Sequence, residues 1–195
     1  MTNILPPWRA PVARALHRNR AQPFSRYLQL ATVTPEGMPT NRTVVFRSFY
    51  GDSNYLQIIT DIRSEKYEHL KSNPYGEICW YFCKTREQFR LTGKIDIVTA
   101  KTENIEWQKA RKLMWQNISD NAKVQFYWET PKDSYREEST DNEYEINKEL
   151  PNDNFCLLLF AVEKVDHLEL RGEPQNRYLY SLENNSQWQV IRVNP

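Results

Sequence analysis

Short apolar runs separated by turn residues occupy most of the chain. Runs rich in β-branched and aromatic residues recur at 26–34, 38–49, 55–60, 77–82, 87–98, 155–170, 178–182 and 188–193. Turn residues lie between them, as in Pro35-Glu36-Gly37 and Lys84-Thr85-Arg86. This order predicts short strands joined by hairpin turns. Because few helical segments intervene, we expect a mainly β fold with flanking helices, a β-barrel rather than alternating βαβ units.

One segment, residues 41–66, combines strand, turn and helix signals. Residues 42–49 and 55–60 predict two strands of a hairpin, and Ser64 is well placed to cap a helix over 65–71. The free amides at the start of such a helix suit a phosphate group. Cations that would support an anion there are Arg42, Arg47, Arg63 and Lys66. The alternative is an ordinary hairpin with solvated charges.

Four further segments favour helices or a loop. Residues 12–19 predict a short lead-in helix, and residues 100–117 have apolar residues at helical spacing. A second short helix is expected over 124–128. Residues 131–153 are acidic and almost free of aliphatic residues, which predicts an exposed loop or insertion. The nearly continuous apolar start of 155–170 predicts a strand buried on both faces.

Size and charge limit the classes of function. The 195 residues suit one domain, 1–195, in which 155–195 supply the closing strands. A net charge of +1 argues against binding to nucleic acid, and five glycines without a GxGxxG or Walker motif favour neither a Rossmann nor a P-loop fold. No apolar run reaches the about 20 residues of a membrane helix. We expect a cytoplasmic protein, although the arginine-rich start before Glu36 would also suit a transit peptide.

Cysteine and histidine positions predict no metal site. Cys79, Cys83 and Cys156 match neither a CxxC motif nor a zinc knuckle, so we expect reduced thiols in the core. The histidines are scattered along the chain, at positions 17, 69 and 167.

Four motifs resemble those of one known family. RTVVFR (42–47), ITDIRSEK (59–66), REQFRLTGK (86–94) and the closing RYLYSLENNSQWQVIRVNP (177–195) come in the order and approximate spacing of the pyridoxamine 5'-phosphate oxidase family. The resemblance covers about residues 24–195. It implies an FMN-binding split β-barrel that assembles as a homodimer, with FMN at the subunit interface.

The resemblance also implies which residues contact FMN. Matched motif by motif, they are Arg42, Val44, Val45, Arg47, Ile59, Thr60, Ser64, Lys66, Gln88 and Arg177. Three positions depart from the family pattern: Arg47 replaces the usual Lys, Glu65 replaces an Arg, and Leu168 stands where a Trp is expected. Arg63 is a candidate to offset the charge lost at Glu65.

The substrate side of the resemblance is weaker. Trp115, Ser119 and Lys123 stand where the family has the Tyr, Arg and Ser that hold the substrate phosphate, and the family's Arg-x-His motif is absent from RGEPQNR (171–177). A serine hydroxyl should hold a phosphate less strongly than a bidentate guanidinium. Unless Lys123, Arg47 and Arg171 converge, we expect slow oxidation of vitamin B6 phosphates.

Two functions are therefore expected, and the sequence identifies no catalytic residue. The first is an FMN-dependent oxidoreductase for a small-molecule substrate, similar to pyridoxamine/pyridoxine 5'-phosphate oxidase. The alternative is a non-catalytic sensing or storage module that keeps the fold, with or without FMN.

Overall fold

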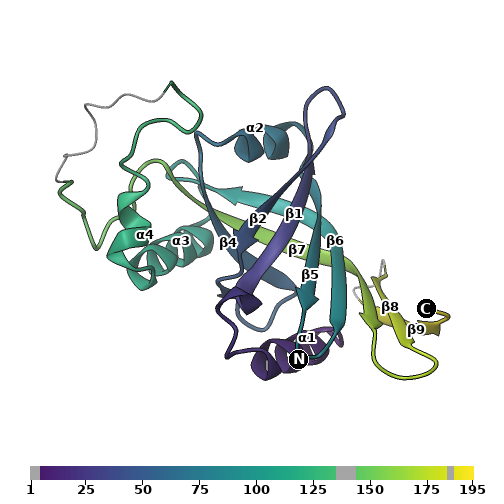
Figure 1. Cartoon of the computed structure of the whole chain (residues 1–195). Helices are drawn as coiled ribbons and strands as arrows, with labels where there is room; N and C mark the ends of the chain where they lie inside the picture. The colour runs from purple at the N-terminus through teal and green to yellow at the C-terminus, as the bar shows by residue number, and fades with distance from the viewer. Residues whose placement is uncertain (1–4, 135–143, 184–186) are drawn as a thin grey trace.

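The computed structural model describes residues 5–134, 144–183 and 187–195 and consists mainly of one antiparallel sheet (Figure 1). Its nine strands follow the order β2-β1-β5-β6-β7-β4-β3, and β8 and β9 extend from β7. The strands are β1 (Tyr27–Val33), β2 (Pro39–Val45), β3 (Ser48–Phe49), β4 (Tyr55–Asp61), β5 (Tyr75–Phe82), β6 (Glu87–Val98), β7 (Phe155–Glu169), β8 (Asn176–Leu182) and β9 (Trp188–Val193). The helices are α1 (Arg9–Arg18), α2 (Glu65–Ser72), α3 (Ile105–Asn117) and α4 (Asp120–Val124), with a 3-10 helix at Pro23–Arg26. The mainly β prediction is confirmed.

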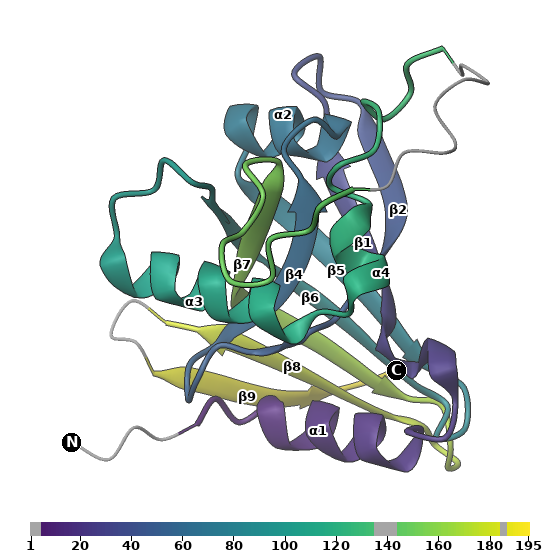
Figure 2. The same ribbon diagram turned by 90° about the vertical axis from the view of Figure 1, so that its left-hand side faces the viewer.

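The central strand is β7, which pairs with β4, β6 and β8. Its first six residues are all buried, as the apolar run predicts. Because alternate residues of a strand point to opposite faces, β7 serves two cores. Cys156, Leu158 and Phe160 pack into the barrel interior. Phe155 and Leu157 pack on the other face, in the cluster that contains α3 and α4 side chains. Figure 2 shows α3 and α4 on the side of the sheet that faces the viewer.

The expected hairpin between 42–49 and 55–60 is wrong in its pairing. Strand β2 pairs along its whole length with β1, while only the two residues of β3 pair with β4. The chain changes partners at two residues: the Phe46 amide donates to the Arg26 carbonyl (2.8 Å), and the Arg47 amide donates to the Gln57 carbonyl (3.0 Å). Alternation along a strand shows which face is buried but carries no information on its partner.

The helix bounds also differ from the predictions. Helix α1 begins at Arg9, before residue 12, because Trp8, Val12 and Ala15 are all fully buried beneath the sheet. Helix α3 begins only at Ile105, since the Asn104 side chain accepts from the Trp107 amide and caps it.

The second short helix lies earlier than expected. Helix α4 covers 120–124 instead of 124–128, because the Ser119 hydroxyl caps it by accepting from the Ala122 amide.

The expectation of three core thiols needs correction. Cys156 is buried and Cys79 half-buried, but Cys83 is exposed in the turn after β5, so it is not a core thiol. Of the predicted loop, residues 135–143 lie outside the described residues, and the described remainder contains no helix or strand. Part of it packs against the protein, because the Asn147 carbonyl accepts from the Trp115 indole (2.8 Å). Among the described residues, none of the helices is both long and apolar enough to cross a membrane.

The pairing of β6 with β7 is irregular next to Gly93, where Glu163 of β7 forms a bulge without a partner residue in β6. The register of the two strands shifts between Thr92 and Gly93. A Cβ atom at Gly93 would lie 1.9 Å from the Ala161 carbonyl oxygen, which is a backbone atom that cannot move away alone. Its cross-strand neighbour Gly76 is also tightly packed, but there the nearest atom, at 2.9 Å, is the flexible Cδ1 of Ile95.

We predict that Gly93→Ala destabilises the fold more than Gly76→Ala does. Because the backbone of β7 must shift to admit the methyl group, the free energy of unfolding should fall by about 3 kcal/mol, the upper end for overpacking. Urea unfolding followed by tryptophan fluorescence measures both variants. Equal losses would show that the bulge accommodates a side chain.

Candidate functional site

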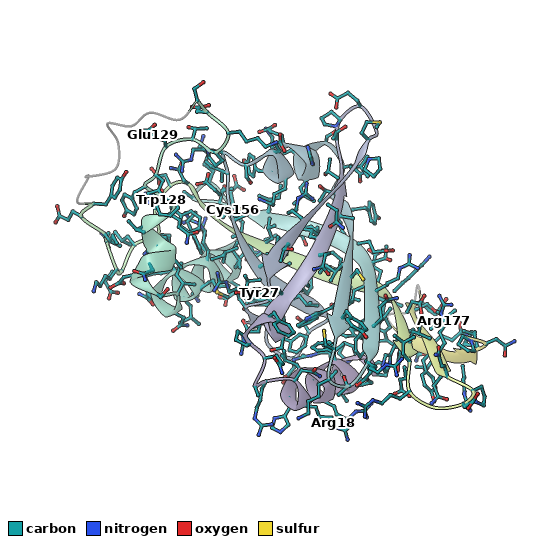
Figure 3. The ribbon with its side chains drawn as sticks, in the orientation of Figure 1. Arg18, Tyr27, Trp128, Glu129, Cys156 and Arg177 are labelled. Carbon is teal, nitrogen blue, oxygen red and sulfur yellow. The ribbon has the colours of Figure 1, made fainter. Side chains whose placement is uncertain are left out.

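A hollow of about 380 Å³ lies between the ends of β2 and β4, the start of α2 and the segment from α4 to Pro131. Its lining residues are Thr43, Val44, Val45, Arg47, Ile59, Thr60, Asp61, Lys66, Ala122, Gln125, Phe126, Trp128 and Pro131. Figure 3 labels Trp128 beside α4. We call this space the β2/β4 hollow.

The β2/β4 hollow brings together most of the residues expected at a flavin site. Those that line it are Val44, Val45, Arg47, Ile59, Thr60 and Lys66. Ser64 lies beside it, because its hydroxyl is 3.1 Å from that of Thr60. Ser64 precedes α2 as predicted, but its side chain donates to the Asp61 carbonyl (2.6 Å) and does not cap the helix.

The end of the hollow next to α2 is positively charged. The ammonium of Lys66 is mostly withdrawn from water and donates to the Thr60 hydroxyl (3.1 Å). Burial, followed by the nearby Arg42 guanidinium, lowers the pKa of Lys66. Burial also lowers the pKa of Arg42, whose hydrogen bonds go to neutral acceptors on β1 and β2. Two desolvated cations side by side fit a bound anion.

Arg63 does not offset the charge lost at Glu65. Its guanidinium binds Asp61 through two nitrogens (3.0 and 2.7 Å) and donates to the Trp128 carbonyl (2.8 Å). Glu65 instead forms an ion pair with Lys132 on the exposed side of α2. Arg63 is therefore neutralised by Asp61, and Glu65 by Lys132, so Lys66 and Arg42 remain as the cations without a carboxylate partner among the described residues.

Arg47 carries a buried donor without a partner in the described part of the chain. Its Nε atom is shielded from solvent and makes no hydrogen bond there. Burial, and then the like charge of Arg26, lowers the pKa of Arg47. Since an unpaired buried donor costs about 1–3 kcal/mol, the arrangement suits a ligand that supplies an acceptor.

Arg47 also borders a second, larger hollow of about 670 Å³ between the β2–β3 corner and α3. Arg26, which sequence reasoning did not single out, lines this space and donates to the Arg47 carbonyl (3.0 Å). We call it the corner hollow. Its only acidic lining residue among those described is Glu106, which is paired with Lys109 (2.8 Å).

Gln88 and Arg177 do not line the β2/β4 hollow. They lie in one cross-strand row on β6, β7 and β8, on either side of Leu168. The Arg177 guanidinium holds Asp166 through two nitrogens (2.9 and 2.6 Å). Figure 3 shows Arg177 near the β8–β9 hairpin and Trp128 on the other side of the molecule. One chain therefore holds the expected flavin residues in two separate groups.

The three expected substrate residues also do not form a site. Trp115 is 0% exposed, and its ring packs edge-on against Phe155 (5.1 Å between centroids), so it belongs to the core. Ser119 caps α4, and Lys123 is 4% exposed and paired with Asp120 (3.3 Å).

The convergence that would rescue a substrate phosphate is likewise not observed. Arg47 borders both hollows described above, Lys123 is buried and lines neither of them, and Arg171 lines another hollow beside α1.

Helix α4 and the two residues after it contribute to the β2/β4 hollow through side chains that the sequence reasoning missed. Ala122, Gln125 and Phe126 face the space, each adjacent to or near a residue that had been assigned to the substrate. The N-cap signal of Ser119 would have placed the helix correctly and with it this face.

The β2/β4 hollow fits FMN by its own residues. Lys66 lines the hollow and suits a phosphate, and Val44, Val45 and Ile59 provide an apolar wall for a flat ring system. Arg42 does not line the hollow, but its guanidinium is close enough to lower the pKa of Lys66 and would support the same phosphate. The unpaired Nε of Arg47 suits an acceptor on such a ring.

Comparisons with known proteins agree with this interpretation. A family model described as pyridoxamine 5'-phosphate oxidase, FMN-binding domain, matches residues 5–99. A protein of Arabidopsis thaliana named pyridoxine/pyridoxamine 5'-phosphate oxidase 2 is 35% identical over 193 residues, 97% of each chain.

Two solved structures have the same fold. A pyridoxamine 5'-phosphate oxidase-related, FMN binding protein from Nostoc punctiforme is 46% identical, with a TM-score of 0.94 over 98% of this chain and 100% of that one. PhzG from Burkholderia lata, solved with tetrahydrophenazine-1-carboxylic acid, has a TM-score of 0.74 over 98% of this chain and 94% of its own, at 15% identity, which supports the fold alone.

We predict that Lys66→Ala and Arg42→Ala each weaken FMN binding. Each removes a charged hydrogen bond to the phosphate, worth about 1.5–3 kcal/mol, or roughly 10- to 150-fold in Kd. Isothermal titration of the flavin-free protein measures the loss. Lys71→Ala is the matched control, because Lys71 is on the same helix but pairs with Glu68 on the exposed side. Unchanged Kd in both test variants would remove these residues from the site.

The same titration should depend on pH. Because the pKa of Lys66 is lowered in the free protein, this lysine loses its charge at a lower pH than an exposed lysine does. FMN affinity should therefore fall as the pH rises through that lowered pKa. Riboflavin, which lacks the phosphate, should not show this fall.

Proposed function

The chain belongs to the pyridoxamine 5'-phosphate oxidase family, whose fold is an FMN-binding split barrel, and from this premise we propose that it is an FMN-dependent oxidoreductase for a small anionic substrate. The main support is the relative named as an oxidase, which aligns over nearly the whole chain. The desolvated cations of the β2/β4 hollow add physical support, since they fit the cofactor phosphate.

Different residues of the hollows would bind the cofactor phosphate, shield its ring and orient the substrate. FMN, when bound, supplies the hydride acceptor, its N5 atom, and the protein supplies position and electrostatics. Lys66 and Arg42 would hold the phosphate, and the apolar wall of Val44, Val45 and Ile59 would exclude water from the ring. Arg47 lies where the two hollows meet, so its guanidinium is placed to contact both cofactor and substrate.

An anionic substrate is supported by the charge of the corner hollow. Arg26 and Arg47 have no carboxylate partner among the described residues, and Glu106 is already paired with Lys109. A phosphate or carboxylate group would accept charged hydrogen bonds from both guanidinium groups. These two arginines would then act in place of the helix residues that the family uses.

We predict slow turnover of pyridoxine and pyridoxamine 5'-phosphates. Trp115 and Lys123 are buried and Arg171 lies elsewhere, so Arg26 and Arg47 alone must compensate the substrate dianion. Hydrogen peroxide production by FMN-loaded protein under oxygen measures the steady-state rate. Robust turnover at micromolar substrate would contradict the predicted slowness and show that two arginines suffice.

The same assay, applied to a variant of Arg26, tests whether this arginine binds the substrate anion. Arg26→Met should raise KM at least tenfold for any substrate that is oxidised, since one charged contact is lost. Lys109→Met is the control, because Lys109 lines the same hollow but is paired with Glu106. If the protein shows the flavin spectrum but none of these substrates reduces its flavin, the non-catalytic module is the correct alternative.

We further propose that the protein acts as a homodimer. The two groups of flavin residues, separated in one chain, would meet if the Gln88–Arg177 row of one copy faced the β2/β4 hollow of another. Large apolar side chains remain exposed on the described surface, among them Leu113 and Ile105 on α3 at 59% and 69%. Covering them would favour association.

Light scattering at micromolar concentration should give about twice the 23.3 kDa chain mass. Arg177→Glu should then weaken FMN binding, although Arg177 does not line the hollow of its own chain. Arg192→Glu on the adjacent strand β9 is the control, since Arg192 bonds the Asn176 amide oxygen (2.6 Å). A 23 kDa particle would exclude the dimer.

A further inference from the structure

A third hollow, of about 370 Å³, lies beneath α1, next to the start of β6 and the end of β7. Its lining residues are Arg14, Arg18, Thr85, Glu87, Glu169 and Arg171. None of them lines the β2/β4 hollow or the corner hollow. Figure 3 labels Arg18 at α1, away from Trp128. We call this space the α1 arginine pocket.

Three guanidinium groups in this pocket have unused donors. Arg14 and Arg18 are one helical turn apart, so both side chains point from the same face of α1. Arg14 has an ion pair with Glu169 at 3.7 Å, which exceeds hydrogen-bond distance. Arg171 donates to the Lys84 carbonyl (2.6 Å), and Arg18 has no hydrogen bond within the described residues. Each guanidinium has five N–H donors, so most remain available.

The two carboxylates, in contrast, are already bound by protein groups. Glu87 is 5% exposed and pairs with the buried His167 (3.0 Å). Burial raises the pKa of Glu87, but hydrogen bonds from His167 and Thr85 outweigh it, so the net shift is downward. Glu169 accepts from the Asn176 amide (3.1 Å). Counting three arginines against two glutamates, the lining carries one net positive charge when His167 is neutral.

A metal ion is the competing ligand for this site. Glu87, His167 and Glu169 offer ligand atoms within 4.8 Å of one another. The same carboxylates, however, face three arginines, and Arg14 is already paired with Glu169. A divalent cation would have to displace that arginine and remain near the other two, whereas an anion meets free donors. The charge distribution therefore favours an anion.

We propose that the α1 arginine pocket is a binding site for a phosphate group, carried by a small phosphate monoester or present as inorganic phosphate. Guanidinium groups match phosphate oxygens with paired, charged hydrogen bonds. The volume lies within the range of small-ligand pockets and leaves room for an organic group beside the phosphate. The site is separate from the flavin and substrate hollows, so it would be occupied independently of them.

Isothermal titration of the FMN-loaded full chain with inorganic phosphate and with phenyl phosphate tests the proposal. We expect a phosphate site that the Arg26→Met variant retains, because Arg26 lines the corner hollow and not this pocket, with glycerol giving no signal. The double variant Arg14→Gln/Arg18→Gln should lose at least tenfold in affinity, and Arg171→Gln should also lose affinity. Arg20→Gln is the matched control, since Arg20 follows α1 but bonds His17 and does not line the pocket.

The competing sites have distinct outcomes. Lys66→Ala should leave this binding unchanged, so loss in that variant would assign the phosphate to the β2/β4 hollow and overturn the proposal. Equal affinity of wild type and the double variant, or no binding at millimolar phosphate, would also overturn it. Binding of Zn²⁺ that Glu169→Gln abolishes, without phosphate binding, would show a metal site instead. Tighter binding of phenyl phosphate than of inorganic phosphate would support the monoester as ligand.

Discussion

The double burial of β7 is the constraint on which the rest of the molecule depends. Its alternate side chains fill the barrel interior on one face and the α3–α4 cluster on the other. The backbone is fixed from both directions, because β4 and β6 pair with the same residues of β7 around Leu157–Ala161. Arg111 of α3 also donates to the Phe155 carbonyl (3.0 Å). Two walls of the β2/β4 hollow, β4 and α4, are therefore positioned by β7, a strand that does not line the hollow.

Charged groups at the site differ from those elsewhere in the chain. Arginines that do not line the β2/β4 hollow, such as Arg63, Arg90 and Arg177, hold carboxylates through two nitrogens. At the hollow, Lys66 and Arg47 are withdrawn from water without such a partner. Buried charge without a partner costs stability, and an anionic ligand offsets that cost. Buried cations without a carboxylate partner therefore distinguish this hollow from the other charged groups described above.

Local signals made the neighbouring strand pairs predictable. Turn residues after alternating strands fix the β1/β2, β5/β6 and β8/β9 hairpins, and the apolar run of β7 identifies its burial. The pairing of β4 with β7 joins residues almost 100 positions apart, for which no local pattern exists. The candidate site follows the same division: Val44, Arg47, Thr60 and Lys66 line one hollow because they lie on elements that are close together in the sequence. Trp115 was misplaced because apolar helical spacing does not distinguish a core ring from a pocket wall.

At the change of strand partner, the backbone position of residue 47 does not depend on the side chain that residue 47 carries. The backbone there is tied to the Arg26 carbonyl on one side and to the Gln57 carbonyl on the other, through main-chain amides that every residue except proline possesses. The Cα of residue 47 is consequently held in place whatever its side chain is. A lysine or an arginine at this position would start from the same point at the border of the two hollows. Selectivity for a ligand could therefore be retuned at this single position without redesigning the barrel.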